Sequence, residues 1–346
     1  MKIVYLVAST KEISGGMRVI FEHVNQLARY GHNVEVWKAN EDDQPYFECE
    51  VPIRTYQDEQ LNEPDVVVMT DCVFIPAVSI HRKRRGTYLL LQHDNEWVSE
   101  VMNVATYAGL IKEYKSYFES GNCEIIVVSS WLQALVQEKY ALDSHIILNG
   151  VDGNLFHPVR PILQLDAPLA LLFYDPQSWK GFGEAIAALL EVKNTQENLQ
   201  IAIIGRYFPE TPQVEGMSFG FPFPAIYFNR PKQQDLAKIY SSADVFVSAS
   251  WKEGFGLPGL EAMACGVPVV TTDAGGNREY AVDEQTALIV PQQNITAMSD
   301  EILRILSDDK LHERLRRNGL GKAKGLTWDK SIKKLEGIFE SSILLT

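Results

Sequence analysis

The residues with the clearest chemical potential lie between Glu253 and Glu261, in the run EGFGLPGLE. A proline fits the first turn of a helix, because its φ is fixed and that position needs no N–H donor. The glycines let the backbone approach a ligand, and the amides of Gly256, Leu257 and the following turn favour a phosphate oxygen. The run therefore predicts a phosphate-binding loop and a helix on which Glu261 accepts hydrogen bonds from ribose hydroxyls, with Glu253 as a second carboxylate. The alternative is a capped structural helix with two solvated glutamates.

Such a loop must be positioned by a strand before it and a helix after it, and the chain alternates these elements throughout. Helical spacing of apolar residues predicts helices over 20–28, 183–191, 234–240, 298–306 and, from Trp328, over the last segment. Continuous apolar runs predict buried strands of parallel sheets. These runs are residues 3–8, 33–37, 66–69, 88–91, 125–128, 169–174, 200–204, 245–248, 267–271 and 287–290.

The length of 346 residues also predicts two domains, each large enough to bury a core. A proline-containing segment from His157 to Pro168 separates two sets of strands. The predicted fold class is α/β, with two doubly wound Rossmann-like domains over 1–158 and 159–327. Ligands of such sheets bind at the carboxyl ends of the strands, so we expect the domains to face each other across a central cleft.

Composition excludes several classes of protein. The net charge of −13 argues against broad binding of nucleic acid phosphates. The four cysteines stand without a metal-binding spacing, which argues against a zinc site or a disulfide framework. No run reaches the roughly 20 apolar residues of a membrane span, and the N-terminal apolar run is too short for a signal peptide. We therefore expect a cytoplasmic protein.

The segment 253–270 resembles the E-x7-E motif, EGFGLPxLEAMAxGxPVV, of the retaining glycosyltransferases of family 4, which have the GT-B fold. The match is nearly residue for residue, and the resemblance extends over almost the whole chain in the order of the family's motifs. The other matching positions are Ser14-Gly15-Gly16 (N-terminal glycine loop), Asn149-Gly150-Val151-Asp152 with Phe156 and Pro158 (crossover), Lys180-Gly181 (Lys-Gly pair), residues 236–244 (helix before the donor site) and Gly275-Gly276-Asn277-Arg278-Glu279 (G-G-x-x-E turn).

The resemblance implies transfer of a sugar from a nucleotide donor, bound by the C-terminal domain, to an acceptor bound by the N-terminal domain. It also implies that the last helix, 328–346, crosses back to the N-terminal domain; packing on its own domain is the alternative. Carried over by position, Glu253 would hold the sugar hydroxyls and Glu261 the ribose. Lys180 would hold the diphosphate. The remaining donor-binding positions would be Gly15, Gly16, Gly254, Phe255, Gly256 and Leu257.

The leaving diphosphate gains negative charge in the transition state, and a fixed ammonium with convergent amides stabilises that charge. We therefore expect catalysis without a metal or other cofactor. At the end of the strand over 88–91, the resemblance implies that His93 lines the donor sugar, although most lone histidines are structural or surface residues. Asp94 and Glu96 are candidates for acceptor contacts.

One position departs from the family. An arginine usually stands five residues before the Lys-Gly lysine, whereas this chain has Asp175. A carboxylate there would repel phosphates, so we predict that Arg206, after the strand over 200–204, replaces the missing cation. Arg230 and Lys232 are weaker candidates, and Lys180 with the backbone amides could also suffice.

A basic run, Arg82, Lys83, Arg84 and Arg85, interrupts the acidic composition. It predicts peripheral contact with a membrane or an anionic acceptor, and a solvated surface is the alternative.

The function predicted from the sequence is a retaining, metal-independent hexosyltransferase that uses a UDP-linked sugar, such as UDP-glucose. Its acceptor would be a glycan or a lipid-linked saccharide at the inner face of the membrane, in polysaccharide or glycoconjugate synthesis. The alternative is a non-catalytic GT-B subunit that binds nucleotide or glycan within a glycosylation assembly. A dinucleotide-dependent oxidoreductase would need G-x-G-x-x-G after the first strand, and Ser14-Gly15-Gly16-Met17-Arg18 lacks it.

Overall fold

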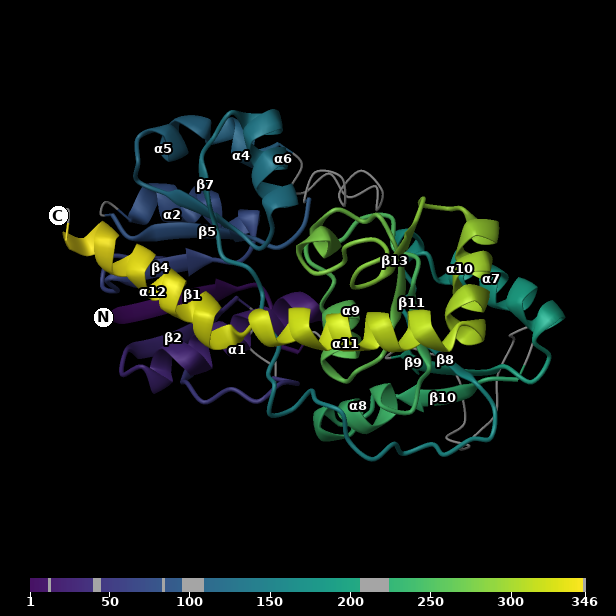
Figure 1. The fold of residues 1–346 in the computed structure, drawn as a ribbon. Helices are drawn as coiled ribbons and strands as arrows, with labels where there is room; N and C mark the ends of the chain where they lie inside the picture. Colours follow the sequence, from purple (N-terminus) through teal and green to yellow (C-terminus); the bar gives the residue numbers. More distant parts are fainter. Residues whose placement is uncertain (12–13, 40–44, 83–84, 95–108, 206–223, 345–346) are drawn as a thin grey trace. The chain divides into compact units, whose positions relative to one another are not determined.

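The computed structural model describes residues 1–11, 14–39, 45–82, 85–94, 109–205 and 224–344, which form two units (Figure 1). Unit 1 comprises Met1–Gly150 and Trp328–Thr346, and unit 2 comprises Val151–Thr327. The division falls after Gly150, before the boundary at residue 158 that the sequence predicted. The residues after Gly150 bind to unit 2, because the Val151 amide donates to Leu326 (N···O 2.9 Å) and the Val159 amide to the Ser241 hydroxyl (3.2 Å).

Unit 1 contains a parallel sheet whose described strands lie in the order β3-β2-β1-β4-β5-β6-β7. The central strand β1 is buried because its residues from Ile3 to Val7 are all apolar. The strands are β1 (Lys2–Val7), β2 (Asn33–Lys38), β3 (Ile53–Thr55), β4 (Val66–Met69), β5 (Thr87–Leu91), β6 (Glu124–Val127) and β7 (Ser144–Ile146). The helices are α1 (Gly15–Arg29), η1 (Asp58–Gln60), η2 (Cys72–Phe74), α2 (Ile75–His81), α4 (Leu110–Glu113), α5 (Lys115–Glu119), α6 (Ser130–Tyr140) and α12 (Trp328–Leu344).

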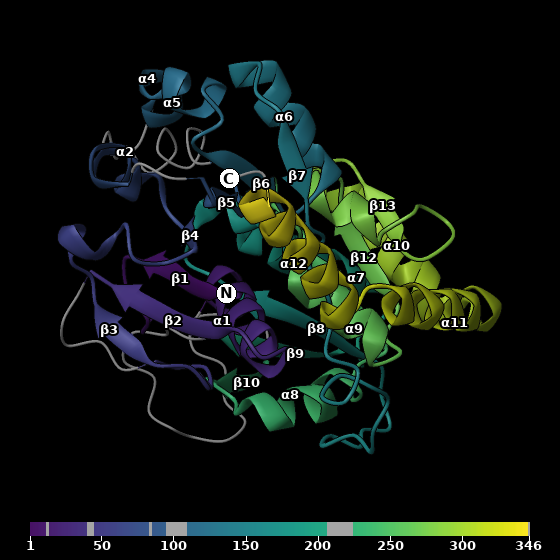
Figure 2. The same ribbon diagram turned by 90° about the vertical axis from the view of Figure 1, so that its left-hand side faces the viewer.

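The last helix, α12, returns to unit 1 and lies beside α1 (Figures 1 and 2), which confirms the predicted crossing back. The Tyr30 hydroxyl donates to the Asp329 carboxylate (2.7 Å). The rings of Tyr88 and Phe339 lie 4.9 Å apart between centroids. Phe339 is fully buried, so α12 is part of the core of unit 1.

Unit 2 contains a second parallel sheet, with its described strands in the order β10-β9-β8-β11-β12-β13. Each sheet is doubly wound, as the sequence predicted. The strands are β8 (Leu169–Tyr174), β9 (Gln200–Gly205), β10 (Ile226–Asn229), β11 (Val245–Ser248), β12 (Val269–Thr272) and β13 (Leu288–Val290). The helices are η3 (Ser178–Lys180), α7 (Phe182–Thr195), α8 (Gln233–Tyr240), α9 (Leu257–Ala264), η4 (Gly276–Glu279), α10 (Ile295–Ser307) and α11 (Asp309–Gly325).

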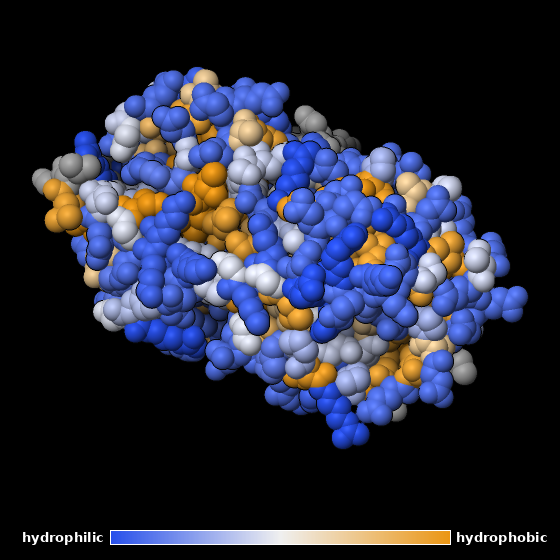
Figure 3. All heavy atoms as spheres, viewed as in Figure 1, coloured by the Kyte–Doolittle hydropathy of each residue, from blue (hydrophilic) through white to orange (hydrophobic). Residues whose placement is uncertain are grey.

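The surface of α11 is mostly hydrophilic in the view of Figure 3, whereas hydrophobic atoms show at the end of α12, where Leu344 is 86% exposed. None of the helices within the described ranges combines the length and the apolar character that a membrane span requires.

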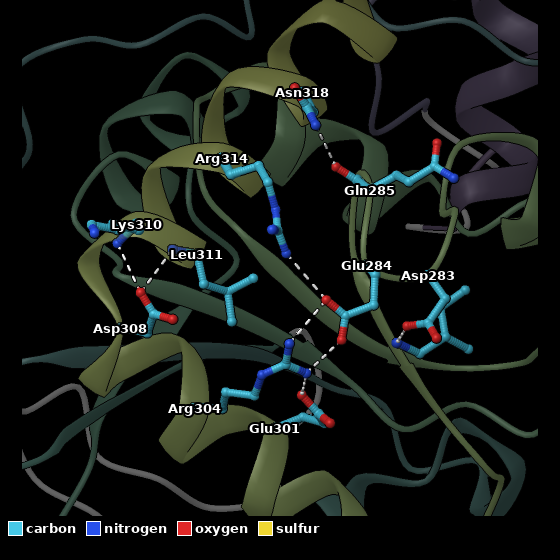
Figure 4. Close-up of polar contacts among 11 residues, drawn as sticks. Asp283, Glu284, Gln285, Glu301, Arg304, Asp308, Lys310, Leu311, Arg314 and Asn318 are labelled. Atoms are coloured by element: carbon cyan, nitrogen blue, oxygen red, sulfur yellow. Dashed lines mark hydrogen bonds and ion pairs between the residues drawn. The ribbon is translucent and has the colours of Figure 1, made fainter.

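A charged cluster ties the turn before β13 to α10 and α11 (Figure 4). Arg304 donates to both oxygens of Glu284 (2.5 and 2.9 Å) and to Glu301 (3.0 Å), and Arg314 donates to Glu284 (3.1 Å). The hydrogen bonds from Arg304 lower the pKa of the Glu284 carboxyl. Glu284 also adopts a left-handed backbone conformation (φ 59°), which costs free energy in any residue except glycine.

Replacing Glu284 with alanine should therefore destabilise unit 2 only slightly, by about 1 kcal/mol or less, since the cluster is exposed to solvent. Because the pKa of Glu284 is lower in the folded state, its contribution is present at neutral pH and is lost as the pH falls through the folded-state value. Urea titrations at neutral and acidic pH, with and without high salt, measure this effect. A loss of stability that neither acid nor salt reduces would show that the ion pairs are not its source.

The predicted contact surface of the basic run requires a correction. Arg82 is only 2% exposed, and its guanidinium donates to the Thr87 hydroxyl (2.7 Å) and to backbone carbonyls. Arg82 is thus a structural residue of unit 1 and no part of a membrane surface. Arg85 is exposed, and Lys83 and Arg84 lie outside the described residues.

Candidate functional site

The candidate site in unit 2 begins where β8 ends and η3 leads into α7. Gly181, between η3 and α7, has φ +64°, and a Cβ there would lie 2.0 Å from the carbonyl oxygen of Ala249. The Trp251 amide donates to the Trp179 carbonyl (2.7 Å). Only glycine permits this close approach, which brings Lys180 beside the loop that follows β11.

The two predicted residues of this region are in direct contact. Lys180 Nζ lies 2.8 Å from Glu253 Oε1, although the residues are 73 positions apart in the sequence. The Ser250 hydroxyl donates to the same oxygen, also at 2.8 Å. The side chains of Lys180 and Glu253 are 29% and 18% exposed, so this pair can meet a ligand from solvent. The structure therefore brings together an ammonium and a carboxylate that the sequence had singled out separately, and adds a serine that sequence reasoning missed.

The backbone of Glu253 is held by the turn after β12. Its amide donates to the Ala274 carbonyl (2.8 Å), and its carbonyl accepts from the Gly276 amide (2.9 Å). A Cβ on Gly276 would lie 1.9 Å from the carbonyl oxygen of Gly254. The two glycine-rich segments of the predicted motif set thus fit against each other, and a larger residue at position 276 would push Glu253 away from Lys180.

Helix α9 begins after Gly256, whose φ of +83° is the left-handed conformation. The Tyr280 hydroxyl donates to the Gly256 carbonyl (2.6 Å). A Cβ on Gly259 would lie 2.4 Å from the same hydroxyl oxygen. Burial, and then the charges of Glu253 and Glu261, raise the pKa of Tyr280, so the hydroxyl stays a donor. Tyr280, which sequence reasoning missed, fixes the loop that was predicted to meet the phosphate.

The predicted ribose-binding residue, Glu261, is buried inside unit 2 at 5% exposure. The hydroxyl of Tyr240, at the end of α8, donates to Glu261 Oε2 (2.9 Å). This bond fixes the orientation of a carboxylate that lies one turn into α9. Its contact with a ribose stays a prediction.

The side chains of Phe255 and Leu257 are 3% and 6% exposed, and the Phe255 ring lies 5.8 Å from that of Tyr280. These two predicted donor-binding residues therefore pack in the core, and only their backbone groups are suited to meeting a ligand. Asp175, which was expected to repel phosphates, accepts a hydrogen bond from the Gln177 amide (3.0 Å) and so shapes the turn before η3. Its proposed replacement, Arg206, lies outside the described residues.

The predicted residues of unit 1 lie at the carboxyl ends of β1 and β5. Gly15 and Gly16 are the first residues of α1, whose N-cap Ser14 accepts from the Met17 amide (3.1 Å). The Gln92 amide group donates to the Gly16 carbonyl (3.2 Å), a contact that nothing in the sequence pattern signalled. His93 is exposed.

The acceptor role predicted for Asp94 is not what its surroundings favour. Asp94 is 4% exposed, and its two oxygens accept from Lys139 at 2.8 and 3.0 Å. This pair ties the segment after β5 to α6, so Asp94 is a structural residue of unit 1. Glu96 lies outside the described residues.

Within the ranges that the structure describes, no group of three histidine, cysteine, aspartate or glutamate residues could hold a metal ion. The cysteines are reduced. The unit 2 site contains a lysine in contact with a carboxylate, a second carboxylate on α9 and the amides at the start of that helix, a set that suits a ligand carrying both phosphates and hydroxyls.

Comparison with known proteins agrees with the family resemblance found in the sequence. Residues 171–321 match the family model described as glycosyl transferases group 1. A 103-residue segment, 30% of this chain, is 39% identical to O-antigen chain mannosyltransferase B of Escherichia coli and covers 26% of that protein. A longer alignment, over 277 residues and 72% of the chain, is 24% identical to a D-inositol 3-phosphate glycosyltransferase of Xylanimonas cellulosilytica and covers 66% of it. The matched segments thus span between about a quarter and two thirds of these relatives.

Solved structures resemble the whole chain. Sucrose-phosphate synthase from Thermosynechococcus elongatus superposes with a TM-score of 0.81 at 20% identity, with all of both chains covered. HepE of Anabaena, solved with UDP and glucose, superposes with a TM-score of 0.76 at 15% identity over 99% of this chain and 100% of its own. The fold is therefore GT-B, and the sequence match of residues 171–321 supports a glycosyltransferase of group 1.

Proposed function

We propose that this chain, whose residues 171–321 match the group 1 glycosyl transferases, moves a hexosyl group from a UDP-linked sugar to a glycan or lipid-linked saccharide. The observation that carries the proposal is the contact of Lys180 with Glu253 beside the start of α9. In the proposal, Lys180 is the cation for the diphosphate and Glu253 is the carboxylate for the sugar hydroxyls. HepE has been solved with UDP and glucose and with UDP-glucose, which supports a UDP-linked donor by analogy.

In the proposed reaction, the bond between the anomeric carbon and the diphosphate oxygen breaks, and the acceptor hydroxyl forms a new bond to the same carbon. The acceptor attacks from the face on which the diphosphate leaves, so the anomeric configuration is retained, and its proton passes to the leaving phosphate. Lys180 and the amides at Leu257 stabilise the charge that develops on the diphosphate. Glu253 orients the sugar through its hydroxyls, and Glu261 binds the ribose. Neither a metal ion nor a side chain acting as general base is needed in this scheme, and a cytoplasmic location is part of the proposal.

A screen of nucleotide sugars for thermal stabilisation tests the donor. Binding of a ligand to the folded state alone raises the melting temperature, so the true donor should give a larger shift than its epimers and than nucleotide sugars with another base. With that donor, NMR of the product should show the donor's anomeric configuration, and activity should persist in EDTA. Inversion, or a loss of activity in EDTA that magnesium restores, would refute the proposed mechanism. Absence of stabilisation by every nucleotide sugar would refute the proposed function itself.

A further inference from the structure

The contact that carries the proposed function also creates a conflict within the site. Lys180 and Ser250 both donate to Oε1 of Glu253, each at 2.8 Å. A diphosphate would require the same lysine ammonium, which can approach phosphate oxygens best by leaving the carboxylate. Glu253 therefore competes with the ligand for Lys180.

The two donors differ in their freedom to move. The Lys180 side chain is 29% exposed, and its ammonium stands at the end of a flexible four-carbon chain. Ser250 is 4% exposed, and its carbonyl accepts a hydrogen bond from the Thr272 hydroxyl at the end of β12. The next residue, Trp251, is tied by its amide to the Trp179 carbonyl (2.7 Å). The backbone that carries the serine hydroxyl is thus fixed on both sides, and Glu253 Oε1 is the nearer acceptor of that hydroxyl (2.8 Å, against 3.5 Å for the Lys180 carbonyl), whereas the ammonium can swing.

We propose that Ser250 is a positioning residue that retains Glu253 when Lys180 transfers to the diphosphate. This inference rests on the proposed function. With the lysine withdrawn, the serine hydroxyl still donates to Oε1, so the carboxylate keeps the orientation in which it can receive sugar hydroxyls. The Lys180–Glu253 ion pair is the state that a nucleoside diphosphate must break, and Ser250 lowers the free energy of that exchange.

The proposal predicts opposite changes in the affinity for a nucleoside diphosphate for two substitutions. Glu253→Gln removes the charge that competes for Lys180, so affinity for a free nucleoside diphosphate should rise, by about 3- to 10-fold. Ser250→Ala deprives Glu253 of its second donor, so the free energy needed to separate Lys180 from Glu253 is higher than in the wild type. The affinity should then fall, by about 2- to 10-fold, as expected for one hydrogen bond. In the Glu253→Gln background, Ser250→Ala should change the affinity by less than about 2-fold.

The experiment is isothermal calorimetry of UDP, GDP and ADP on the full chain, with the wild type, both single variants and the double variant. Ser250→Thr, which keeps a hydroxyl, should recover most of the affinity lost in Ser250→Ala. Ser307→Ala is the matched control, because its exposed hydroxyl also makes a hydrogen bond in unit 2, to the Leu303 carbonyl (2.7 Å). Melting temperatures of all variants identify any that fail to fold.

Each outcome distinguishes the inference from the proposed function. An equal loss of affinity from Ser250→Ala in both backgrounds would show a merely structural serine and overturn the inference while the proposed function stands. Unchanged affinity in Ser250→Ala would do the same. A wild type that binds none of the three nucleoside diphosphates would overturn both.

Discussion

Replacing Lys180 with alanine should lower the turnover of sugar transfer by roughly 10²- to 10³-fold, the usual cost of removing one preorganised group that stabilises transition-state charge. The diphosphate carries more negative charge as it leaves than it does in the bound donor. An ammonium near it is therefore worth more in the transition state than in the ground state. The substitution should lower kcat more than it raises the KM for the donor.

Steady-state kinetics with the donor identified by the stabilisation screen measure this effect. Lys238→Ala is the matched control, since Lys238 is also an ion-paired lysine of unit 2, at 2.9 Å from Asp235. That variant should retain turnover. If the Lys180→Ala enzyme has a higher KM for the donor and an unchanged kcat, Lys180 binds the donor without stabilising the transition state.

Replacing Arg82 with methionine should destabilise unit 1 by about 3–5 kcal/mol, because several buried acceptors would lose their donor and each unsatisfied acceptor costs about 1–3 kcal/mol. The guanidinium of Arg82 donates to the Thr87 hydroxyl and to five backbone carbonyls. These carbonyls belong to Leu61 (2.8 Å), Pro64 (3.0 Å), Asp65 (2.9 Å), Arg85 (3.0 Å) and Gly86 (3.2 Å). A guanidinium has five N–H groups, so every one of them is used. Methionine fills a similar volume but leaves these acceptors without the donor.

Urea denaturation of the Arg82→Met and Arg82→Lys variants measures the loss. Lysine supplies three donors on one atom and cannot span carbonyls from separate turns, so Arg82→Lys should recover only part of the stability. Arg85→Met, at an exposed neighbouring position, is the control and should change the free energy of unfolding by less than about 0.5 kcal/mol. An Arg82→Met protein as stable as this control would contradict the structural role of Arg82.

The sequence predicted the central strands of both sheets and the helices with a clear apolar face, because their apolar runs and spacings are strong signals. It missed β3, β7 and β10, which are short and lie toward the sheet edges, where half-exposed side chains weaken the pattern. It also missed α6 and α11, and in α11 lysines, arginines and glycines mask the few buried positions such as Leu311 and Leu315. Buried charge was the hardest feature to predict. Nothing in the run RKRR distinguishes Arg82 from its neighbours, because the backbone carbonyls that bind its guanidinium surround it only in the folded chain.

For the site, the motif singled out Lys180 and Glu253, which the structure shows in contact, and the structure added the residues that orient the motif. Ser250, Tyr240 and Tyr280 act through hydrogen bonds to a carboxylate or a carbonyl that lies close to them only after the chain has folded. Ordinary serines and tyrosines carry no local signal for such a contact. Their positions depend on which strands lie side by side, which one sequence does not specify.

The return of α12 to unit 1 means that this unit is not continuous in the sequence. Every residue of unit 2 is synthesised before α12, and until then Tyr30 and Tyr88 lack the partners Asp329 and Phe339. Although domains generally fold in the order of synthesis, the ribosome delivers a complete unit 2 before a complete unit 1. We therefore expect unit 2 to become resistant to proteolysis first, in nascent chains stalled before Trp328. Unit 1 should become resistant only once the final helix has emerged.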